Sequence, residues 1–216
     1  MSNPFRIIYE DEDLVVVSKK EGICVVRGRG SLADIPSVVD MLRDIYQSIF
    51  VVHRIDMETS GIVVFAKNPL SHRELSILFE KRKVFKRYLA LVWGRISSRL
   101  IVDKPIKEFS SGRSAVSDEG KPSTTVIKPL SFFRRFSLIE VFPHTGRRHQ
   151  IRVHLYSIGH PIVGDQLYGD KEKQSFFKRM FLHSASISFK LKGKIYRFDD
   201  SNEFIDEINE ALSEGF

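Results

Sequence analysis

Apolar and polar residues alternate along the chain in short runs, a pattern that predicts more strands than helices. Residues 6–10 and 14–18 surround an acidic turn at 11–13 and are typical of a β-hairpin. Further strands are predicted at residues 49–52, 62–67, 85–93, 100–106, 124–129 and 136–142, and a last hairpin at 182–190 and 195–198.

Helices are predicted where apolar residues recur three or four positions apart. The first helix is predicted at residues 37–49, with apolar positions 38, 42, 45 and 49, and the third at residues 146–158. The second, at residues 69–82, has Pro69 in its first turn and Leu75, Leu78 and Phe79 facing inward. The fourth is the tail at 199–216, with Phe204, Ile208 and Leu212 on one side. Strands outnumber helices and mostly follow one another without helical crossovers. The expected class is therefore α+β, with a mixed, largely antiparallel central sheet flanked by helices and loops.

No repeat or flexible linker divides the chain, so residues 1–216 are predicted to form a single domain with an acidic C-terminal helix at 199–216. The chain has 42% hydrophobic and 28% charged residues, and it has no long apolar run that would span a membrane. The N-terminus lacks the pattern of a secretory signal. The single cysteine, Cys24, excludes an intramolecular disulfide and a cysteine-based zinc site. We therefore expect a cytoplasmic protein.

Charge is unevenly distributed along the chain, whose formal net charge is +7. Residues 199–216 contain seven acidic residues and no Lys or Arg, so residues 1–198 carry a net charge of +14. An excess of this size indicates a polyanionic partner, with nucleic acid the leading candidate. Solubility is the alternative explanation for a basic surface.

The sequence HRIDMETSG, at residues 53–61, places polar residues between two predicted strands. Loops at strand ends are where rigid scaffolds present reactive groups. Two interpretations are open for Asp56: it caps backbone N–H groups in a turn, or it is a catalytic carboxylate. If the strand continues through these residues, Arg54 and Asp56 share one face and His53 lies on the other.

The sequence HTGRRHQIRVH, at residues 144–154, predicts the start of the third helix, with Thr145 as its N-cap. Arg147 and Arg148 would then lie in the first turn, where the helix dipole disfavours cations. A bound phosphate would remove that penalty, and a solvated pair that tolerates it is the alternative. The histidines of this motif recur every five residues, a spacing that does not favour a helical zinc site, so no metal is expected.

Residues 81–94, KRKVFKRYLALVWG, combine basic and aromatic side chains. Five of the first seven residues are basic, which suits an edge that follows a phosphate backbone. Tyr88 shares a strand face with Ala90 and Val92. It either stacks on a nucleobase or packs in the core with its hydroxyl satisfied.

Together these segments resemble the RluA-type family of pseudouridine synthases. HRIDMETSGIVVFAKN, from residue 53, is similar to the family motif around the catalytic aspartate, and KRYLALVWG, from residue 86, to its tyrosine-bearing strand. HTGRRHQIRVHLYSIGHPIVGDQLYG, at residues 144–169, is similar to the third family motif. The resemblance runs from residue 7 to residue 190. It implies a pseudouridine-synthase-like fold with a basic RNA-binding cleft, and neither a cofactor nor a metal.

The resemblance also implies roles for individual residues. Asp56 is the catalytic carboxylate, Tyr88 is the aromatic residue that stacks on the target base and assists proton transfer, and Arg152 is the cation that pairs with Asp56. Arg54 resembles the residue that displaces the uridine from its stack and fills the vacancy. The other predicted substrate-binding residues are His53, Thr59, Arg147, His149 and Gln150.

The implied function is isomerisation of specific uridines in structured RNA, either rRNA or tRNA, to pseudouridine by base flipping, glycosidic cleavage, base rotation and C–C bond formation. The alternative is a non-catalytic RNA-binding protein that retains the synthase fold. The expected partner is an RNA stem–loop, and the expected state is a monomer. Two features depart from the family: its N-K-P-x-G sequence is replaced by SKKEG at residues 18–22, and no accessory N-terminal RNA-binding module is expected because the similarity begins so early.

Overall fold

The computed structural model describes residues 3–28 and 35–213, which belong to two compact units. Unit 1 comprises Met1–Phe85 and Ser184–Asp200, and unit 2 comprises Lys86–His183 and Ser201–Phe216. The ends of the predicted domain, including residues 214–216 of the predicted acidic helix, lie outside the described residues. The single domain expected for residues 1–216 stays a prediction.

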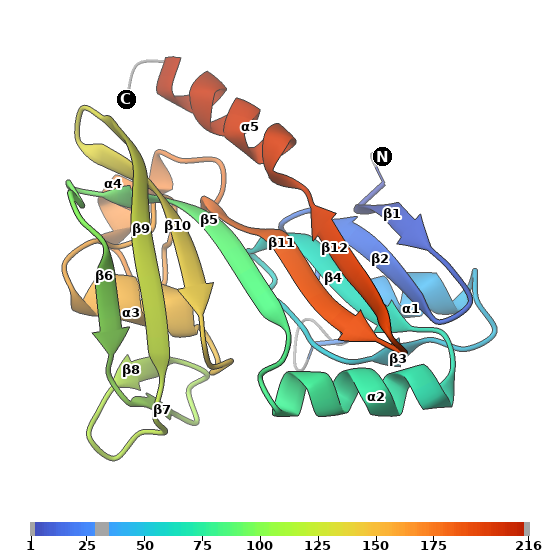
Figure 1. Ribbon diagram of the computed structural model, residues 1–216. Coiled ribbons are helices and arrows are strands. Elements are labelled where there is room, and N and C mark those ends of the chain that lie inside the picture. Colours follow the sequence, from blue (N-terminus) through green and yellow to red (C-terminus); the bar gives the residue numbers. More distant parts are fainter. Residues whose placement is uncertain (1–2, 29–34, 214–216) are drawn as a thin grey trace. The chain divides into compact units, whose positions relative to one another are not determined.

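Unit 1 is built on a sheet in which β1 (Phe5–Glu10), β2 (Leu14–Lys19), β4 (Ser60–Ala66) and β11 (Leu182–Leu191) lie in that order, as Figure 1 shows. Two further strands, β3 (Phe50–Val51) and β12 (Lys194–Asp199), pair with β4 and β11. The hairpins β1–β2 and β11–β12 are antiparallel, as predicted. Both β2 and β4 are nearly continuous apolar runs, and they are buried on both faces.

Two helices accompany the sheet of unit 1. Helix α2 (Pro69–Glu80) begins where expected, because Asn68 caps it by accepting a 2.8 Å hydrogen bond from the Ser71 N–H. Helix α1 (Val38–Arg43) is shorter than the predicted helix at 37–49, and Ile45 is 61% exposed rather than part of a buried stripe. The chain turns away after Arg43, and the Tyr46 hydroxyl donates to Glu10 Oε2 at 2.7 Å. Periodicity does not reveal such a tertiary contact.

Unit 2 contains a second row of strands in the order β5 (Phe85–Trp93), β10 (Phe136–Pro143), β9 (Thr124–Phe133) and β6 (Leu100–Asp103), with antiparallel pairing throughout. The predicted strand at 100–106 is wrong as one element, because Pro105 cannot donate to a ladder and separates β6 from β7 (Ile106–Glu108). β7 pairs with β8 (Ser114–Val116) in a separate two-stranded sheet, and its Ile106 also forms an isolated bridge to Lys121. The predicted α+β class, with a mixed, largely antiparallel sheet flanked by helices, is confirmed.

The described residues of unit 2 form three helices: α3 (Gln150–Ser157), α4 (Lys171–Ser175) and α5 (Ser201–Ser213). The amphipathic helix predicted in the acidic tail is confirmed by α5, in which Phe204 and Ile208 are buried. Phe204 stacks on His183 with ring centroids 4.8 Å apart, and Glu207 pairs with Arg179 at 2.6 Å. The acidic helix is therefore held to unit 2 by both apolar and ionic contacts.

Helix α3 begins later than predicted, and its first turn differs. The helix starts at Gln150, and its N-cap position is held by His149 in the left-handed conformation (φ 54°) without a side-chain cap. Thr145 is therefore not the N-cap, and Arg147 and Arg148 precede the helix instead of occupying its first turn.

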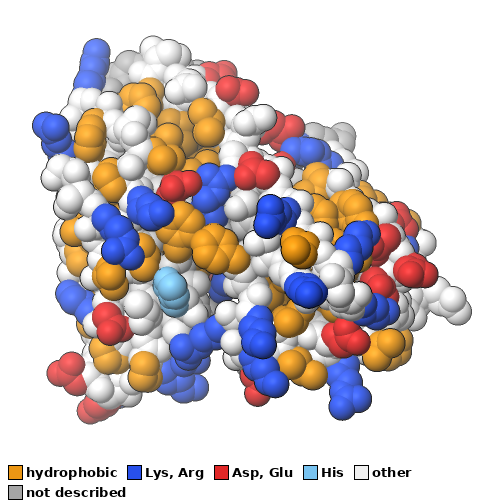
Figure 2. Space-filling model, viewed as in Figure 1, with side chains coloured by type: hydrophobic (Ala, Val, Ile, Leu, Met, Phe, Trp, Pro, Cys, Tyr) orange, Lys and Arg blue, Asp and Glu red, His pale blue; other side chains and the backbone are white. Residues whose placement is uncertain are grey.

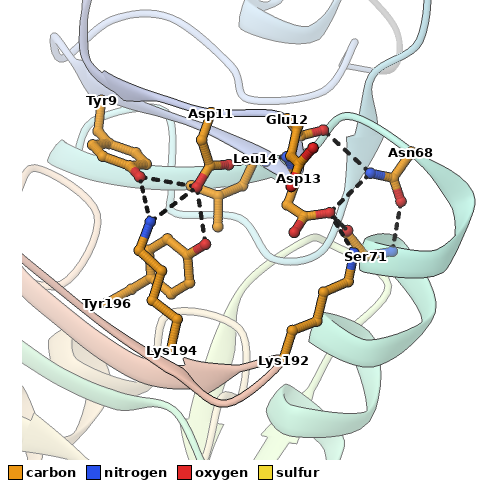
Figure 3. A network of polar contacts seen from close by, with 10 residues as sticks. All are labelled: Tyr9, Asp11, Glu12, Asp13, Leu14, Asn68, Ser71, Lys192, Lys194 and Tyr196. Atoms are coloured by element: carbon orange, nitrogen blue, oxygen red, sulfur yellow. Dashed lines mark hydrogen bonds and ion pairs between the residues drawn. The ribbon is translucent and has the colours of Figure 1, made fainter.

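A polar network joins three turns of unit 1, as Figure 3 shows. Asp13, in the β1–β2 turn, accepts hydrogen bonds from Asn68 Nδ2 at 3.1 Å, Ser71 Oγ at 2.5 Å and Lys192 Nζ at 2.6 Å. The carboxylate therefore links the hairpin β1–β2 to the start of α2 and to the turn between β11 and β12. Burial by itself would raise the pKa of Asp13, but these hydrogen bonds outweigh it and lower the pKa to about 2.

We predict that Asp13→Asn lowers the free energy of unfolding by about 2 kcal/mol at neutral pH, because an amide cannot pair with the Lys192 ammonium. A lowered carboxyl pKa stabilises the fold above the unfolded value of 3.8, and that stability is lost as pH falls from 3.8 towards 2. The free energy of unfolding, measured with urea at neutral and acidic pH, should therefore change less with pH in the variant than in the wild type. Glu12→Gln, at an exposed position in the same turn, is the control and should behave like the wild type.

Candidate active site

Asp56 lies in the segment that connects β3 to β4 in unit 1. β3 ends at Val51, so the strand does not continue through Arg54 and Asp56. Burial nevertheless still alternates: Ile55 is 8% exposed, Arg54 is exposed and Asp56 is half-buried. The segment thus presents Arg54 and Asp56 towards the surface of unit 1 while Ile55 anchors it in the core.

The turn after Asp56 is tightly defined. The Thr59 N–H donates to the Asp56 carbonyl oxygen at 3.1 Å, and Thr59 itself is buried. Gly61 has a φ of +105°, and a Cβ at this position would lie 2.4 Å from the carbonyl oxygen of Ser184. Only glycine permits this approach of β4 to Ser184, which explains the Thr-Ser-Gly sequence that follows the aspartate.

Lys19, which has no predicted role, supports the Asp56 turn from inside unit 1. Its side chain is 1% exposed, and Nζ donates to the carbonyl oxygens of Lys20 at 2.8 Å, Ile23 at 2.9 Å and Met57 at 3.1 Å. Burial lowers the pKa of Lys19 to about 8, against the opposing effect of acidic groups that include Asp56. A buried ammonium thus holds the backbone beside Asp56 and attracts its carboxylate. In the sequence, Lys19 is the first lysine of SKKEG, and it corresponds to the lysine of the family's N-K-P-x-G.

His53 packs within unit 1. Its Nε2 accepts a hydrogen bond from the Val64 N–H at 3.0 Å, and its ring stacks on Phe79 with centroids 4.6 Å apart. These contacts orient the start of the Asp56 segment against β4 and α2. A substrate-binding role for His53 stays a prediction.

Tyr88 lies on β5 in unit 2, opposite Val141 of β10. It is half-buried and packs against a cluster that contains Ala90 and Val92, so the predicted strand face is confirmed. The ring is therefore held by the core on one side, which suits a side chain that must present a fixed surface.

Arg152 of α3 forms a buried ion pair within unit 2. Its Nε and Nη2 each donate to a different carboxylate oxygen of Asp165 at 2.8 Å, and the two side chains are almost completely buried. Asp165 also accepts from the N–H groups of Leu167 and Tyr168 at 3.0 and 3.2 Å. The guanidinium is therefore held in one orientation by Asp165, a residue of the third motif for which no role is predicted.

Gln150 is 4% exposed and joins the loop before α3 to β9. Its Oε1 accepts from Thr145 Oγ1 at 2.7 Å and from the Arg147 N–H at 3.1 Å, while Nε2 donates to Thr124 O and Thr125 Oγ1 at 3.0 Å. Both ends of the amide are thus engaged inside unit 2. In the free protein Gln150 shapes the loop that carries Arg147.

Polar donor groups are buried in this loop and at Lys86 of the neighbouring strand β5. Arg147 Nε is buried and has no hydrogen-bond partner in the described part of the chain. Lys86 Nζ lies 4.0 Å from the position that a Cβ on Gly146 would occupy, and burial lowers the pKa of Lys86. His149 Nδ1 is 2.8 Å from the Tyr168 hydroxyl. A loop with buried donors of this kind is suited to an anionic ligand.

Basic and apolar side chains are mixed over the visible face of each unit, as Figure 2 shows. Within residues 3–28 and 35–213, no three His, Cys, Asp or Glu side chains are grouped so that they could hold a metal ion. Over the same residues, none of the helices has the length and apolar character needed to cross a bilayer.

Residues 13–157 match the sequence profile of the family described as RNA pseudouridylate synthase. The chain belongs to this family. The match includes Asp56, Tyr88, Arg147 and Arg152, and it confirms the resemblance inferred from the motifs. Named members of the family are RNA pseudouridine synthases, which are isomerases that act on RNA.

Two relatives from Vibrio parahaemolyticus illustrate the similarity. The chain is 36% identical over 196 residues to a dual-specificity RNA pseudouridine synthase RluA, covering 85% of this chain and 76% of the relative. It is 39% identical over 190 residues to a ribosomal large subunit pseudouridine synthase C, of which it spans 60%. Among solved structures, human RNA Pseudouridylate Synthase Domain Containing 1 aligns with a TM-score of 0.81 and 26% identity, over 97% of this chain and 94% of the human chain.

We predict that Lys19→Met lowers the free energy of unfolding by about 1–3 kcal/mol, because carbonyl groups beside the Asp56 turn lose their donor. Isomerisation should slow while RNA affinity is retained. Chemical unfolding and a single-turnover assay measure the two effects. Lys20→Met, at the exposed neighbouring position, is the matched control; equal behaviour of the two variants would contradict a supporting role for Lys19.

We expect Asp165→Asn to lower the free energy of unfolding by more than Lys19→Met does, because the buried Arg152 guanidinium loses its counter-charge. Breaking one partner of such a pair costs roughly 3–5 kcal/mol of folding stability. Thermal and chemical denaturation would show the loss. Glu172→Gln removes an exposed carboxylate from nearby α4 and should leave the unfolding midpoint almost unchanged.

Proposed function

We propose that this protein converts specific uridines of ribosomal or transfer RNA to pseudouridine, with Asp56 as the catalytic carboxylate. The observation that carries the proposal is the position of Asp56, half-buried in a family-matched segment and backed by the buried ammonium of Lys19. The cytoplasm, where such RNA is found, is the proposed location.

The reaction is an isomerisation in which the N1–C1′ bond breaks and a C5–C1′ bond forms. The C5 proton leaves and N1 gains a proton, so no atom is lost overall. The target base must first leave its stack, which costs a few kcal/mol and least in a loop. Exposed Arg54, two residues before Asp56, is proposed to occupy the space that the flipped uridine vacates.

Asp56 must be ionised for either of two routes: attack of its oxygen on C1′, or removal of the 2′ proton. We assign the orientation of the Asp56 carboxylate to the Arg152 guanidinium, which Asp165 already holds rigidly through Nε and Nη2. A preorganised cation of this kind costs no reorganisation when the reaction begins. Tyr88, held by the core of unit 2, is assigned to stack on the detached uracil and to assist proton transfer at C5.

Arg147 and His149 are proposed to contact the RNA backbone, with Thr59, His53 and Gln150 shaping the segments that carry the contacts. Arg147 supports this proposal because its Nε is a buried donor without a partner in the described residues. A phosphate or a base edge of the RNA would supply the missing acceptor.

The catalytic role of Asp56 is tested by Asp56→Asn, which removes the charge and keeps the shape. We expect pseudouridine formation in RNA from cells that lack this protein to fall by about a thousandfold or more, while RNA affinity is unchanged. Glu58→Gln removes an acidic charge from the same turn and should remain active. Retained activity in Asp56→Asn would refute the catalytic assignment. RNA binding by the wild type without any product would instead favour the non-catalytic RNA-binding alternative.

A further inference from the structure

Unit 2 contains a cavity of about 680 Å³ lined by three segments: the β7–β8 hairpin, α3 and residues 166–171. None of the residues predicted for catalysis or substrate binding lines it. Cavities of this volume accommodate ligands of nucleotide size. The proposed chemistry at Asp56 therefore does not account for this cavity.

The hairpin turn that borders this cavity has a defined shape. The Phe109 N–H donates to Arg113 O, and the Gly112 N–H donates to Phe109 O, each at 2.9 Å. Gly112 has a φ of +82°, and a Cβ there would lie 3.2 Å from Nη2 of Arg148. The guanidinium of Arg148 thus rests against the hairpin turn. This contact connects the cavity to the basic loop that also carries Arg147.

The lining combines flat apolar groups with positive charge. Phe109 and Tyr156 are large aromatic residues that remain 45% and 54% exposed, and Arg113 and Lys171 supply cations. No Asp or Glu is found among the described residues that line the cavity. Aromatic faces with cations and without carboxylates suit a nucleobase that is attached to phosphate.

Ser114 adds an observation that points to a ligand. The residue lines the cavity and is 2% exposed, yet its Oγ forms no hydrogen bond in the described structure. It lies beside the Tyr168 hydroxyl, which already accepts from the Ser114 N–H at 2.9 Å and contacts His149 Nδ1 at 2.8 Å. Buried polar atoms in native proteins nearly always have a partner, so this hydroxyl lacks one that a ligand would provide.

We propose that the cavity binds one nucleotide of the RNA substrate, other than the target uridine. Its base stacks on Phe109 or Tyr156, its phosphates lie near Arg113 and Lys171, and a base or sugar group bonds to Ser114 Oγ. This inference rests on the proposed function. RNA is favoured over a free nucleotide because Arg148 links the hairpin to the loop assigned to the RNA backbone, so one strand would follow a continuous basic surface.

Ser114→Ala gives the first test, because a structural hydroxyl and a ligand-binding hydroxyl predict opposite results. Removing an unpartnered buried Oγ should leave the unfolding temperature of the free protein equal or higher. Affinity for RNA should fall about three- to tenfold, the effect of one lost hydrogen bond. The probes are unmodified transcripts of transfer RNA and of large-subunit ribosomal RNA, bound to protein in an Asp56→Asn background. A lower unfolding temperature with unchanged RNA affinity would overturn the proposal.

The aromatic and basic groups give a second test with matched controls. Phe109→Ala and Tyr156→Ala should weaken RNA binding, whereas Phe109→Tyr and Tyr156→Phe, which keep the rings, should not. The double variant Arg113→Gln/Lys171→Gln should lower the slope of log affinity against log salt by about 1–2. Lys190→Gln/Arg197→Gln removes the same charge from exposed positions of β11 and β12 and should leave the slope unchanged.

The outcomes separate this inference from the proposed function. Cavity variants that bind RNA like their controls, while the wild type still forms pseudouridine, overturn the inference alone. Competition of 5′-UMP for the cavity without any effect of the variants on RNA affinity assigns it to free nucleotides and also overturns the inference. If the wild type binds neither transcript, both proposals fail.

Discussion

The buried ion pair between Arg152 and Asp165 supports the functional surface of unit 2. One carboxylate receives two guanidinium N–H groups and two backbone N–H groups, so α3 and the segment that follows Ile162 are held together at one point. The ring of Tyr168 lies 5.3 Å from the guanidinium carbon of Arg152. Because its hydroxyl contacts His149 and receives the Ser114 N–H, the loop that carries Arg147 and the cavity both depend on this pair.

In unit 1 a buried lysine, rather than an ion pair, holds the functional segment in place. Its proposed catalytic carboxylate lies in a turn rather than on a helix, and a turn requires support for its backbone. Lys19 provides that support by donating to three carbonyl oxygens, one of them the carbonyl of Met57. A buried ammonium is costly to desolvate, and its retention beside Asp56 is consistent with a functional site.

The cavity beside the β7–β8 hairpin is proposed as a second contact site for the RNA substrate. If the protein modifies specific uridines, as proposed, the chemistry at the target base is the same for each of them and does not distinguish them. Contacts to nucleotides outside the target would therefore supply the discrimination. A site that reads a neighbouring nucleotide through stacking would tolerate several bases, whereas the bond to Ser114 Oγ would distinguish among their edges.

Much of the fold followed from the sequence alone. Local periodicity predicted the hairpins, β5, α2, α5 and the α+β class, because alternation and apolar spacing depend on neighbours along the chain. The long motifs identified the family and pointed to Asp56, Tyr88 and Arg152. The strand predicted at 100–106 is divided for a local reason, Pro105, whereas beyond the end of α1 Tyr46 contacts Glu10, which is distant along the chain.

The partners of each candidate residue were decided only in the tertiary structure. Gln150 was expected at the RNA surface, yet its amide is engaged by Thr124, Thr125 and Thr145, which lie up to 26 positions away. The start of α3 moved to Gln150 because that same amide holds the preceding loop outside the helix. The sequence by itself thus identified the family and the residues that we propose carry the chemistry. The pairing of Arg152 with Asp165, the support of the Asp56 turn by Lys19 and the unpartnered Ser114 hydroxyl arise only when the chain is folded, because hydrogen bonding depends on distance in space.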